Sequence, residues 1–538
     1  MQQRRLGSGA VALVAAVVVA QPTPAVAGTD GGIPVSTGTV TAGGLAADLR
    51  NPGFETAGPD GSPAGWSERG QRSASYVEPG GRSGGNRLTH SADHPYRVAT
   101  VQRLTGLRPG DHTLRVAVRA SGGQRDAYVA LSGCGGPTRR VELPRTGPQW
   151  WVEVALTTRV GSGHCTVELV SDGNAGDWAH FDDLTLRPAT RPAGAPALRI
   201  AGADVSHLTK NEHHGAVYRD RGGRPGDALR ILADNGVNYA RVKVWVDPAD
   251  GFSDKADVLA KARRAKALGM GLLVDFHYSD TWADPGKQFK PAAWAELPFD
   301  QLRQALYDHT YDVVASLRRQ GTPADMVQVG NEINGGMLWP DGRWDNWDGL
   351  AALLTAASTA VTDASPRSRV ALHLAEGGDN GGHRWWFDNA VSRGVPFDLI
   401  AVSHYTYWHG PLGSLQANLL DLTARYGKPV MVVETGYGFT LAEQDHEANI
   451  FNASLQQVAG YPATPAGQAE AIRDMVTTVS AVPGALGIFY WEPTWTAVDG
   501  AGWDPADPTS GDGWENQALF DYSGRALPGL RVLGGAAR

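Results

Sequence analysis

Hydrophobic and polar positions alternate in two different ways along the chain, and the change falls near residue 190. Before that point, short segments with a period of two, such as 112–118 and 151–156, are separated by turns rich in Gly, Pro and Asp. This pattern is typical of the half-buried strands of a β-sandwich. We therefore predict an all-β sandwich domain over residues 46–188, followed by an Ala- and Pro-rich linker at 189–197.

Residues 198–538 combine short apolar runs with longer segments of helical period, such as 254–268 and 298–319. Short apolar runs bounded by polar or Gly residues are typical of buried parallel strands. Eight of them alternate with helical segments, which favours a closed (β/α)8 TIM barrel of the α/β class over an open sheet. The runs lie at 200–205, 239–246, 271–276, 326–329, 370–374, 399–403, 430–433 and 486–490.

The first 27 residues have the layout of a secretory signal peptide. Two arginines precede an apolar stretch at 11–20, and small residues at 25–27 form a cleavage motif. The apolar stretch is too short to span a bilayer, and no later segment reaches the ~20 apolar residues required. With a linker expected at 28–45, we predict a secreted, extracellular protein, in which Cys134 and Cys165 form a structural disulfide.

Composition narrows the range of partners. A formal net charge of -8 argues against nucleic acid or an anionic membrane as a partner. The 17 tryptophans suit flat apolar faces for sugar rings, although Trp also fills protein cores.

Two of the apolar runs lead into glutamates. Glu332 follows the run at 326–329, and Glu434 directly follows 430–433. Because the carboxyl ends of barrel strands form the reaction face, two carboxylates there suggest the machinery that cleaves glycosidic bonds. Glu332 is the candidate acid/base and Glu434 the candidate nucleophile, kept ionised by a cation such as Arg241. The alternative is that one of the glutamates is a buried salt-bridge partner.

Polar or aromatic residues also lie at the ends of all the remaining predicted strands. Eight strand ends that converge in this way would form a cleft. Next to Glu332, the Asn331 side chain can hydrogen-bond a sugar hydroxyl. The remaining strand-end residues are Asp204, Ser206, Arg241, Trp245, Asp275, His277, Tyr278, Asn334, His373, Glu376, His404, Tyr405, Trp408, Trp491, Glu492 and Trp495.

The segments around these residues resemble glycoside hydrolase family 53, the endo-β-1,4-galactanases. The matching segments are 202–206, 277–288, 329–340, 434–438, 490–493 and 514–521. The resemblance implies retention of configuration, with Glu332 as acid/base, Glu434 as nucleophile and their carboxyl groups about 5–5.5 Å apart. The chain departs from the family pattern at His404 and Thr406, where the family has Tyr and Pro. The substrate contacts that we predict are Asp204, Arg241, His277, Asn331, Asn334, Trp339, His404 and Trp495.

The same resemblance implies a structural calcium ion, because bacterial members carry one between their last two long loops. Candidate oxygen ligands are Asp445, Glu447, Asn449 and Asp512, although a solvated acidic loop would have the same composition.

The N-terminal sandwich resembles jelly-roll carbohydrate-binding modules at 51–55 and 181–186. A module of this kind keeps an attached enzyme near an insoluble polymer by raising its effective concentration. Its aromatic residues could stack on sugars, although each alone is more often part of a core; they are Tyr96, Trp150, Trp151 and Trp178.

The sequence thus predicts a secreted, monomeric, retaining endo-β-1,4-galactanase that cleaves galactan and arabinogalactan of plant pectin and needs no cofactor for catalysis. Two alternatives remain open at this point. A β-mannanase or β-glucanase on the same barrel would share both glutamates, and substrate profiling would separate them. A non-catalytic carbohydrate-binding protein would bind galactan without cutting it.

Overall fold

The computed structural model describes residues 49–143, 146–148, 151–188 and 198–537. The expected signal peptide, both linkers and Trp150 lie outside these residues. The described chain contains an N-terminal all-β part and a C-terminal barrel, and each is described by itself.

Two antiparallel five-stranded sheets form the N-terminal part, as the period of two predicts. One sheet has the order β1-β4-β9-β6-β7 and the other β2-β3-β10-β5-β8. Side chains from both sheets share one hydrophobic core, and the disulfide between Cys134 and Cys165 is confirmed within it. The strands are β1 (Ser67–Gly70), β2 (Ser75–Pro79), β3 (Asn86–Ser91), β4 (Tyr96–Thr105), β5 (Gly110–Ala120), β6 (Asp126–Ser132), β7 (Arg139–Glu142), β8 (Val152–Val160), β9 (His164–Gly173) and β10 (Trp178–Pro188).

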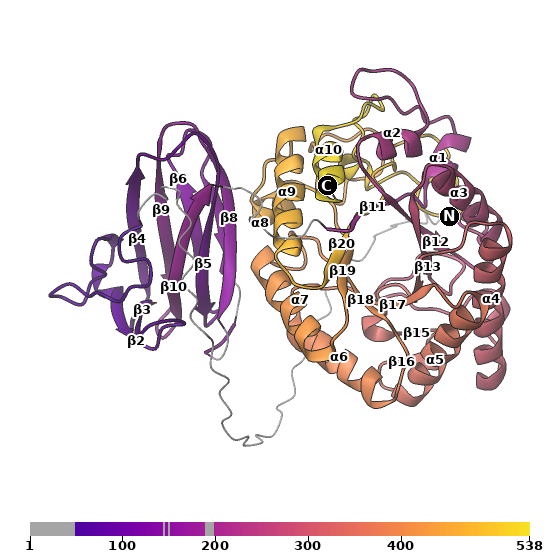
Figure 1. The fold of residues 1–538 in the computed structure, drawn as a ribbon, viewed down its shortest axis with the longest axis horizontal. Helices are drawn as coiled ribbons and strands as arrows, with labels where there is room; N and C mark the ends of the chain where they lie inside the picture. Colours follow the sequence, from indigo (N-terminus) through magenta and orange to yellow (C-terminus); the bar gives the residue numbers. More distant parts are fainter. Residues whose placement is uncertain (1–48, 144–145, 149–150, 189–197, 538) are drawn as a thin grey trace, which may run out of the picture. The chain divides into compact units, whose positions relative to one another are not determined.

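The C-terminal part is a closed barrel of eight parallel strands, so the predicted fold class is confirmed (Figure 1). Each strand begins and ends within two residues of the apolar run that predicted it. The strands are β11 (Ile200–Asp204), β12 (Tyr239–Val244), β13 (Gly271–Phe276), β14 (Met326–Val329), β17 (Arg369–Leu374), β18 (Leu399–Ser403), β19 (Val430–Glu434) and β20 (Ala485–Tyr490). A short hairpin, β15 (Gly336–Met337) with β16 (Gly342–Arg343), follows β14.

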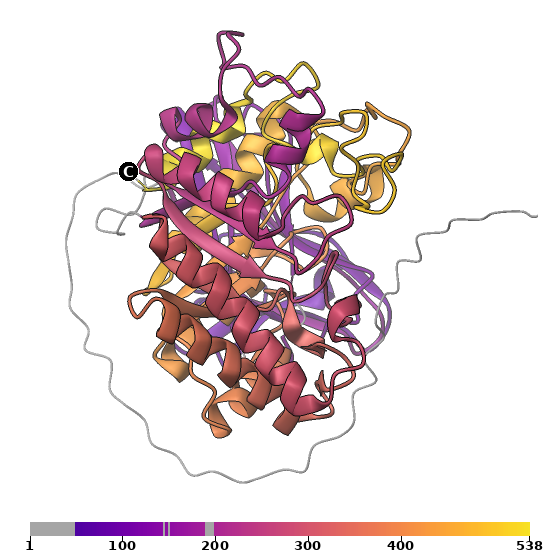
Figure 2. The ribbon, with the colours of Figure 1, turned by 90° about the vertical axis from the view of Figure 1, so that its right-hand side faces the viewer.

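Helices surround the barrel, and Figure 2 views it from the side of α3 and α4. The α-helices are α1 (Leu208–His213), α2 (Ala228–Asp234), α3 (Lys255–Ala267), α4 (Phe299–Arg319), α5 (Trp347–Ala364), α6 (Asn380–Ser392), α7 (Leu412–Tyr426), α8 (Ala453–Ala459), α9 (Pro465–Ser480) and α10 (Pro528–Gly534). Short 3-10 helices are η1 (Arg72–Ala74), η2 (Ala292–Trp294), η3 (Ile333–Gly335), η4 (Glu515–Gln517) and η5 (Gly535–Ala537). Among the described residues, none of the helices combines the length and apolar character that crossing a bilayer demands.

The start of α3 illustrates how local sequence sets these boundaries. Asp254 precedes the helix, and its side chain accepts a hydrogen bond from the backbone N–H of Asp257. This N-cap satisfies one of the donors that a helix start leaves free. Val258, Ala262 and Ala265 then recur on one face at helical spacing and are buried.

Alternation along the barrel strands builds an apolar layer with a polar layer above it. The lower layer of the barrel interior includes Leu273, Met326, Ala371 and Ala401. Because side chains two residues apart on a strand point to the same side, the next inward positions lie one layer closer to the carboxyl ends. Those positions are held by Asp275, Gln328, His373 and Ser403, all buried. The polar floor of the cleft is therefore a consequence of strand periodicity.

Candidate active site

Glu332 and Glu434 come together at the carboxyl ends of the barrel strands. One carboxylate oxygen of each and a ring nitrogen of His373 all lie within 4.8 Å of one another. Glu434 is 5% exposed, and Glu332 is half-buried. The two carboxyl groups thus meet at the short separation that a nucleophile and an acid/base need on either side of one glycosidic bond.

A shift in strand pairing turns Glu434 into the barrel. Met431 and Val433 already point inward, so simple alternation would direct the next side chain toward the helices. The register between β18 and β19 shifts after Val402, and Ser403 pairs with Glu434. Such an irregularity in a strand re-aims the side chain that follows it.

Both carboxylate oxygens of Glu434 have a partner. Arg241 lies 2.8 Å from Oε1, and the Tyr405 hydroxyl donates to Oε2 at 3.1 Å. Burial raises the pKa of Glu434 to about 7, and the positive charge of Arg241 opposes the rise. The guanidinium is therefore the group that favours the ionised form of this carboxyl.

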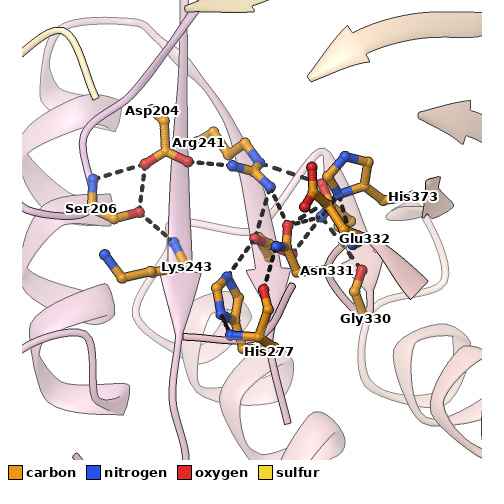
Figure 3. A network of polar contacts seen from close by, with 12 residues as sticks. Asp204, Ser206, Arg241, Lys243, His277, Gly330, Asn331, Glu332 and His373 are labelled. Carbon is orange, nitrogen blue, oxygen red and sulfur yellow. Dashed lines mark hydrogen bonds and ion pairs between the residues drawn. The ribbon is translucent and has the colours of Figure 1, made fainter. Parts of the chain in front are cut away.

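Arg241 is itself held by carboxylates from neighbouring strands (Figure 3). Its NH1 lies 2.6 Å from Asp204 Oδ2 on β11, and its NH2 lies 2.8 Å from Asp275 Oδ2 on β13. The same NH2 donates to Asn331 Oδ1 at 3.0 Å. Burial alone would lower the pKa of Arg241, but the charges of Asp275, Glu434 and Asp204 outweigh it and raise that pKa. One cation thus faces three buried carboxyl groups.

The backbone of Glu332 has an unusual conformation. Gly330 has φ 85°, and Glu332 itself has φ 49° and ψ 50°, in the left-handed region. A non-glycine residue in this region costs of order 1–3 kcal/mol and persists where the surrounding structure enforces it. The two residues turn the chain sharply after β14, so that both Asn331 and Glu332 reach the barrel axis.

The pKa of Glu332 is well above its usual range. Burial is the main cause, followed by the negative charge of Glu434, and a hydrogen bond from Ser403 opposes the rise. Arg241 forms an ion pair with Glu434, whereas no ion pair of Glu332 is found among the described residues, so a proton shared by the two glutamates belongs on Glu332. A neutral acid beside an ionised nucleophile is the division of roles that glycosidases require.

His373 connects Glu332 to Ser403. The backbone N–H of Glu332 lies 3.3 Å from His373 Nδ1, and Gln328 Nε2 lies 2.8 Å from it. Asn331 Oδ1 is also near but already accepts from Arg241, so two N–H donors make Nδ1 an acceptor. The proton is then on Nε2, which donates to Ser403 Oγ at 2.8 Å. This leaves the Ser403 hydroxyl proton free to point at the Glu332 carboxylate.

Burial and the charge of Arg241 lower the pKa of His373 well below its usual range, so the ring is neutral. Two carboxylates and an imidazole could also hold a metal ion. The Arg241 guanidinium already occupies one oxygen of Glu434, and a second cation there would be repelled. The arrangement therefore favours acid/base and nucleophilic roles over a metal centre.

Several predicted substrate contacts lie beneath the cleft surface. Asp204, Arg241, His277 and His404 are each at most 4% exposed. The His277 ring accepts N–H groups of Trp245 and Ala283 at Nδ1 and contacts Asp275 through Nε2. Neither nitrogen of His404 has a hydrogen-bond partner among the described residues. We expect Asp204, Arg241 and His277 to act by holding the groups above them.

Asn331, Asn334 and Trp339 belong to the loop that carries Glu332. Asn331 is 5% exposed, and its amide donates to the carbonyl of Ala283. Asn334 uses both ends of its amide on the backbone of Ala375. Trp339 is half-buried, with its indole N–H bonded to Gly335 O at 2.8 Å. Asn334 therefore joins the loops after β14 and β17, whereas Trp339 is partly exposed to solvent.

Aromatic side chains from the loops after β11, β13 and β20 form a wall at the barrel mouth. Trp495 is 4% exposed and stacks on His207 at 4.0 Å between ring centroids. Trp282 runs parallel to Trp495 at 5.7 Å, and Trp491 lies 5.8 Å from Trp282. Trp282 and Trp491 are half-buried, so they present more surface to a ligand than the predicted Trp495 does.

A second buried ion pair lies beside this wall, between the strand-end residue Glu492 and Lys243, which was not among the predicted residues. Lys243 Nζ is 3.5 Å from Glu492 Oε1 and 4.0 Å from the centre of the Trp282 ring. Lys243 follows Arg241 by two residues on the same strand. Strand alternation therefore could have predicted that its side chain also points into the barrel. Ser403 on the sixth barrel strand could have been found by the same rule, since it follows the inward-facing Ala401 by two residues.

The loops at 440–449 and 512–516 contain the predicted calcium ligands. Asp445 accepts backbone N–H groups of Glu447 and Asp512, so it ties the two loops together. Three buried oxygens have no hydrogen-bond partner in the described residues, namely Asp512 Oδ2, Asn449 Oδ1 and Glu515 Oε2. Burial raises the pKa of Asp512 well above its usual range and that of Glu515 to about 7. Glu515 was not among the predicted ligands.

Aromatic side chains also gather on the sandwich. Trp178 and His180 stack at 4.4 Å on β10, and Arg119 of β5 lies 4.5 Å above the Trp151 ring. Trp151 and Trp178 are half-buried. Tyr96, in contrast, is 1% exposed and donates to the backbone of His90, so it cannot offer a face to a sugar.

Two carboxylates at this separation and of unequal environment, on the reaction face of a (β/α)8 barrel, are the apparatus of glycosidic bond hydrolysis. The protein is a glycoside hydrolase. The family model of glycosyl hydrolase family 53 matches residues 200–533, and the chain belongs to this family.

Similar proteins are found among curated sequences and solved structures. An arabinogalactan endo-beta-1,4-galactanase of Thermothelomyces thermophilus is 36% identical over 345 residues, which cover 63% of this chain and 99% of that protein. An endo-beta-1,4-galactanase of Bacillus subtilis is 36% identical over 369 residues, covering 62% and 85%. The solved family 53 catalytic domain of Ignisphaera aggregans is 43% identical, with a TM-score of 0.61, and the match covers 63% and 97%.

Proposed function

We propose that the protein is an endo-β-1,4-galactanase that cleaves galactan with retention of configuration. The observation that carries the mechanism is the approach of carboxylate oxygens of Glu332 and Glu434 to within 4.8 Å, with Arg241 forming an ion pair with the second of these glutamates. The substrate is supported by the curated relatives of family 53 that are named as galactanases.

In the first step, a Glu434 oxygen attacks the anomeric carbon while Glu332 gives its proton to the departing glycosidic oxygen. A covalent glycosyl-enzyme forms, and the reducing-end part of the chain leaves. In the second step, Glu332, now ionised, removes a proton from water, and the water oxygen displaces Glu434. The Ser403 hydroxyl stabilises Glu332 in its ionised state, which exists between the two steps.

The test is the pair of variants Glu434→Ala and Glu332→Ala, assayed on galactan, mannan and cellulose. Glu434→Ala should lower kcat by at least about 10⁴-fold, and azide should restore turnover with an inverted product. Glu332→Ala should keep activity on substrates with good leaving groups, since those need less protonation. Equal loss on both substrate types would contradict the acid role, and wild-type cleavage of mannan or cellulose in preference to galactan would reassign the substrate.

The same proposal includes a secreted monomer whose N-terminal sandwich binds the polymer that the barrel cuts. Support comes from the signal-like residues 1–27 and from the Trp151–Trp178 group, which offers aromatic surface on one sheet.

We also propose a structural calcium ion between the loops at 440–449 and 512–516. Within the described part of the chain, one oxygen each of Asn449, Asp512 and Glu515 has no hydrogen-bond partner, and such oxygens are of the hard type that calcium prefers. Asp445 joins their two loops. A bound dication would offset the unfavourable burial of two carboxylates. Glu447, also predicted as a ligand, is half-buried at the edge of this group.

A further inference from the structure

Two exposed tryptophans form a pair at the rim of the barrel, beside the loop that carries Glu332. Trp344 follows β16 and is 50% exposed, and Trp385 on α6 is 46% exposed. Their ring centroids are 6.3 Å apart with an interplanar angle of 68°. A Trp side chain is costly to leave in water, so two neighbouring ones on one rim indicate a binding surface.

The pair is tied to the catalytic loop by backbone contacts. The Trp344 N–H donates to Gly335 O at 3.1 Å, and the indole of the buried Trp386 donates to Ile333 O at 2.9 Å. Ile333 and Gly335 are one and three residues beyond Glu332, and three residues of chain span at most about 10 Å. Trp344 and Trp385 are thus built on the scaffold that positions the acid/base.

A third, buried tryptophan packs against the pair. Trp347, at the start of α5, is 8% exposed and packs edge-on against Trp385 at 5.7 Å. Helices α5 and α6 are neighbours in the ring of helices (Figure 1). Rigid aromatic faces lose little conformational entropy when a ligand binds.

Charge around the pair points to a neutral ligand. Arg343 forms an ion pair with Asp345, and Arg393 forms one with Asp348 at 3.0 Å. Arg384, which precedes Trp385 in the chain, lies 3.3 Å from Asp421, so each of these charges has a partner of opposite sign. A neutral sugar chain, whose C–H faces stack on indole rings, fits this surface better than a charged polymer does.

We propose that Trp344 and Trp385 form a distal subsite for galactan on the leaving-group side of the cleavage point. Glu332 protonates the departing oxygen, so the loops that extend outward from Glu332 face the part of the chain that departs. This inference rests on the proposed galactanase function and adds where a long substrate is held.

The experiment measures kcat/KM of the full chain for soluble β-1,4-galacto-oligosaccharides of increasing length that are labelled at the reducing end. In the wild type, kcat/KM should rise with each unit added on the labelled side until the tryptophans are reached. Trp344→Ala should lower kcat/KM for the long oligosaccharides about tenfold, leave the short ones unchanged and move the cleavage site toward the labelled end. Trp344→Phe, which keeps an aromatic face, should retain most of the gain with length.

Tyr311→Ala is the matched control, because Tyr311 is 40% exposed on the outer helix α4. Trp385→Ala provides an independent variant, with its fold checked by thermal unfolding. An unchanged length dependence in Trp344→Ala would overturn the subsite, and so would an equal loss on short and long substrates. If the wild type cleaves none of the galacto-oligosaccharides, the galactanase proposal fails and this inference with it.

Discussion

At the scale of single residues, the site is defined by which carboxyl carries the proton. Glu434 has a cation at 2.8 Å, whereas Glu332 has a serine hydroxyl and a second carboxylate as its neighbours. Activity needs Glu434 ionised and Glu332 protonated. Rates should therefore fall at low pH as Glu434 takes up a proton, and at high pH as Glu332 loses one. Because both pKa values lie above the usual range for Glu, the active window should lie above that range too.

Ser403→Ala tests this reasoning. The hydroxyl stabilises the ionised form of Glu332, so its loss should raise the pKa of Glu332 and move the alkaline limb of the kcat/KM profile to higher pH. The rate of glycosylation should fall by up to about tenfold, since the raised pKa makes Glu332 a weaker acid. A pH–rate profile with pre-steady-state kinetics measures both effects.

Ser403→Thr is the control, because it keeps the hydroxyl. The alkaline limb of its kcat/KM profile should coincide with that of the wild type. A profile of Ser403→Ala that coincides with the wild type would show that the His373–Ser403 connection does not tune Glu332.

At the scale of elements, Arg241 joins four barrel strands through Asp204, Asp275 and Glu434. Replacing it with Met would leave three buried carboxyl groups without a counter-charge. We expect the free energy of unfolding to fall by about 3–5 kcal/mol, as for other buried ion pairs that lose one partner. Denaturant unfolding of Arg241→Met at neutral pH measures the loss.

The stability loss in Arg241→Met should shrink as pH falls, because protonation of the carboxyls removes their repulsion. Arg241→Lys keeps the charge but not the forked geometry of the guanidinium. Its free energy of unfolding should lie between those of the wild type and Arg241→Met. A loss that does not depend on pH would mean that packing, and not charge, explains the role of Arg241.

The long loops after β19 and β20 give a prediction at the same scale. If calcium binds Asn449, Asp512 and Glu515, adding Ca²⁺ at a hundredfold its Kd should stabilise the protein by about 2.7 kcal/mol, and a chelator should remove the gain. Thermal unfolding with and without Ca²⁺ measures it. Asp512→Asn should abolish the difference, whereas Glu443→Gln, an exposed carboxylate of the same loop, should not. Identical thermal unfolding curves with Ca²⁺, with Mg²⁺ and with chelator would contradict the proposed calcium site.

At the scale of the whole molecule, the sandwich and the barrel should contribute separately. Trp178→Ala should weaken binding of the full chain to insoluble galactan several-fold, because it removes the ring stacked on His180. Turnover of soluble oligosaccharides should not change, since the sandwich acts only through effective concentration. Pull-down on insoluble galactan and a parallel soluble assay measure the two properties, with Trp178→Phe as control. Equal losses in both assays would tie the sandwich to catalysis itself.

Much of the fold and part of the site could be predicted from local sequence. The eight apolar runs gave the barrel strands within two residues, and the period-two segments gave the sandwich. The two glutamates could be found because each follows a buried strand. Arg241, His373 and Tyr405, which contact the glutamates, were also found as strand-end residues. The contacts among His373, Ser403 and Gln328 could not be found this way, because these residues are 30 or more residues apart and meet only when the barrel closes.

What the sequence determined by itself is which positions are apolar and how they recur, since side-chain direction along a strand or helix depends only on the local period. Tertiary structure decided which of those positions face one another. The register shift beside Val402 turns Glu434 inward, the left-handed turn at Glu332 brings it to the barrel axis, and Arg241 is shared among three acids. Each of these depends on contacts between distant strands, and the free energy of such contacts exists only in the closed barrel.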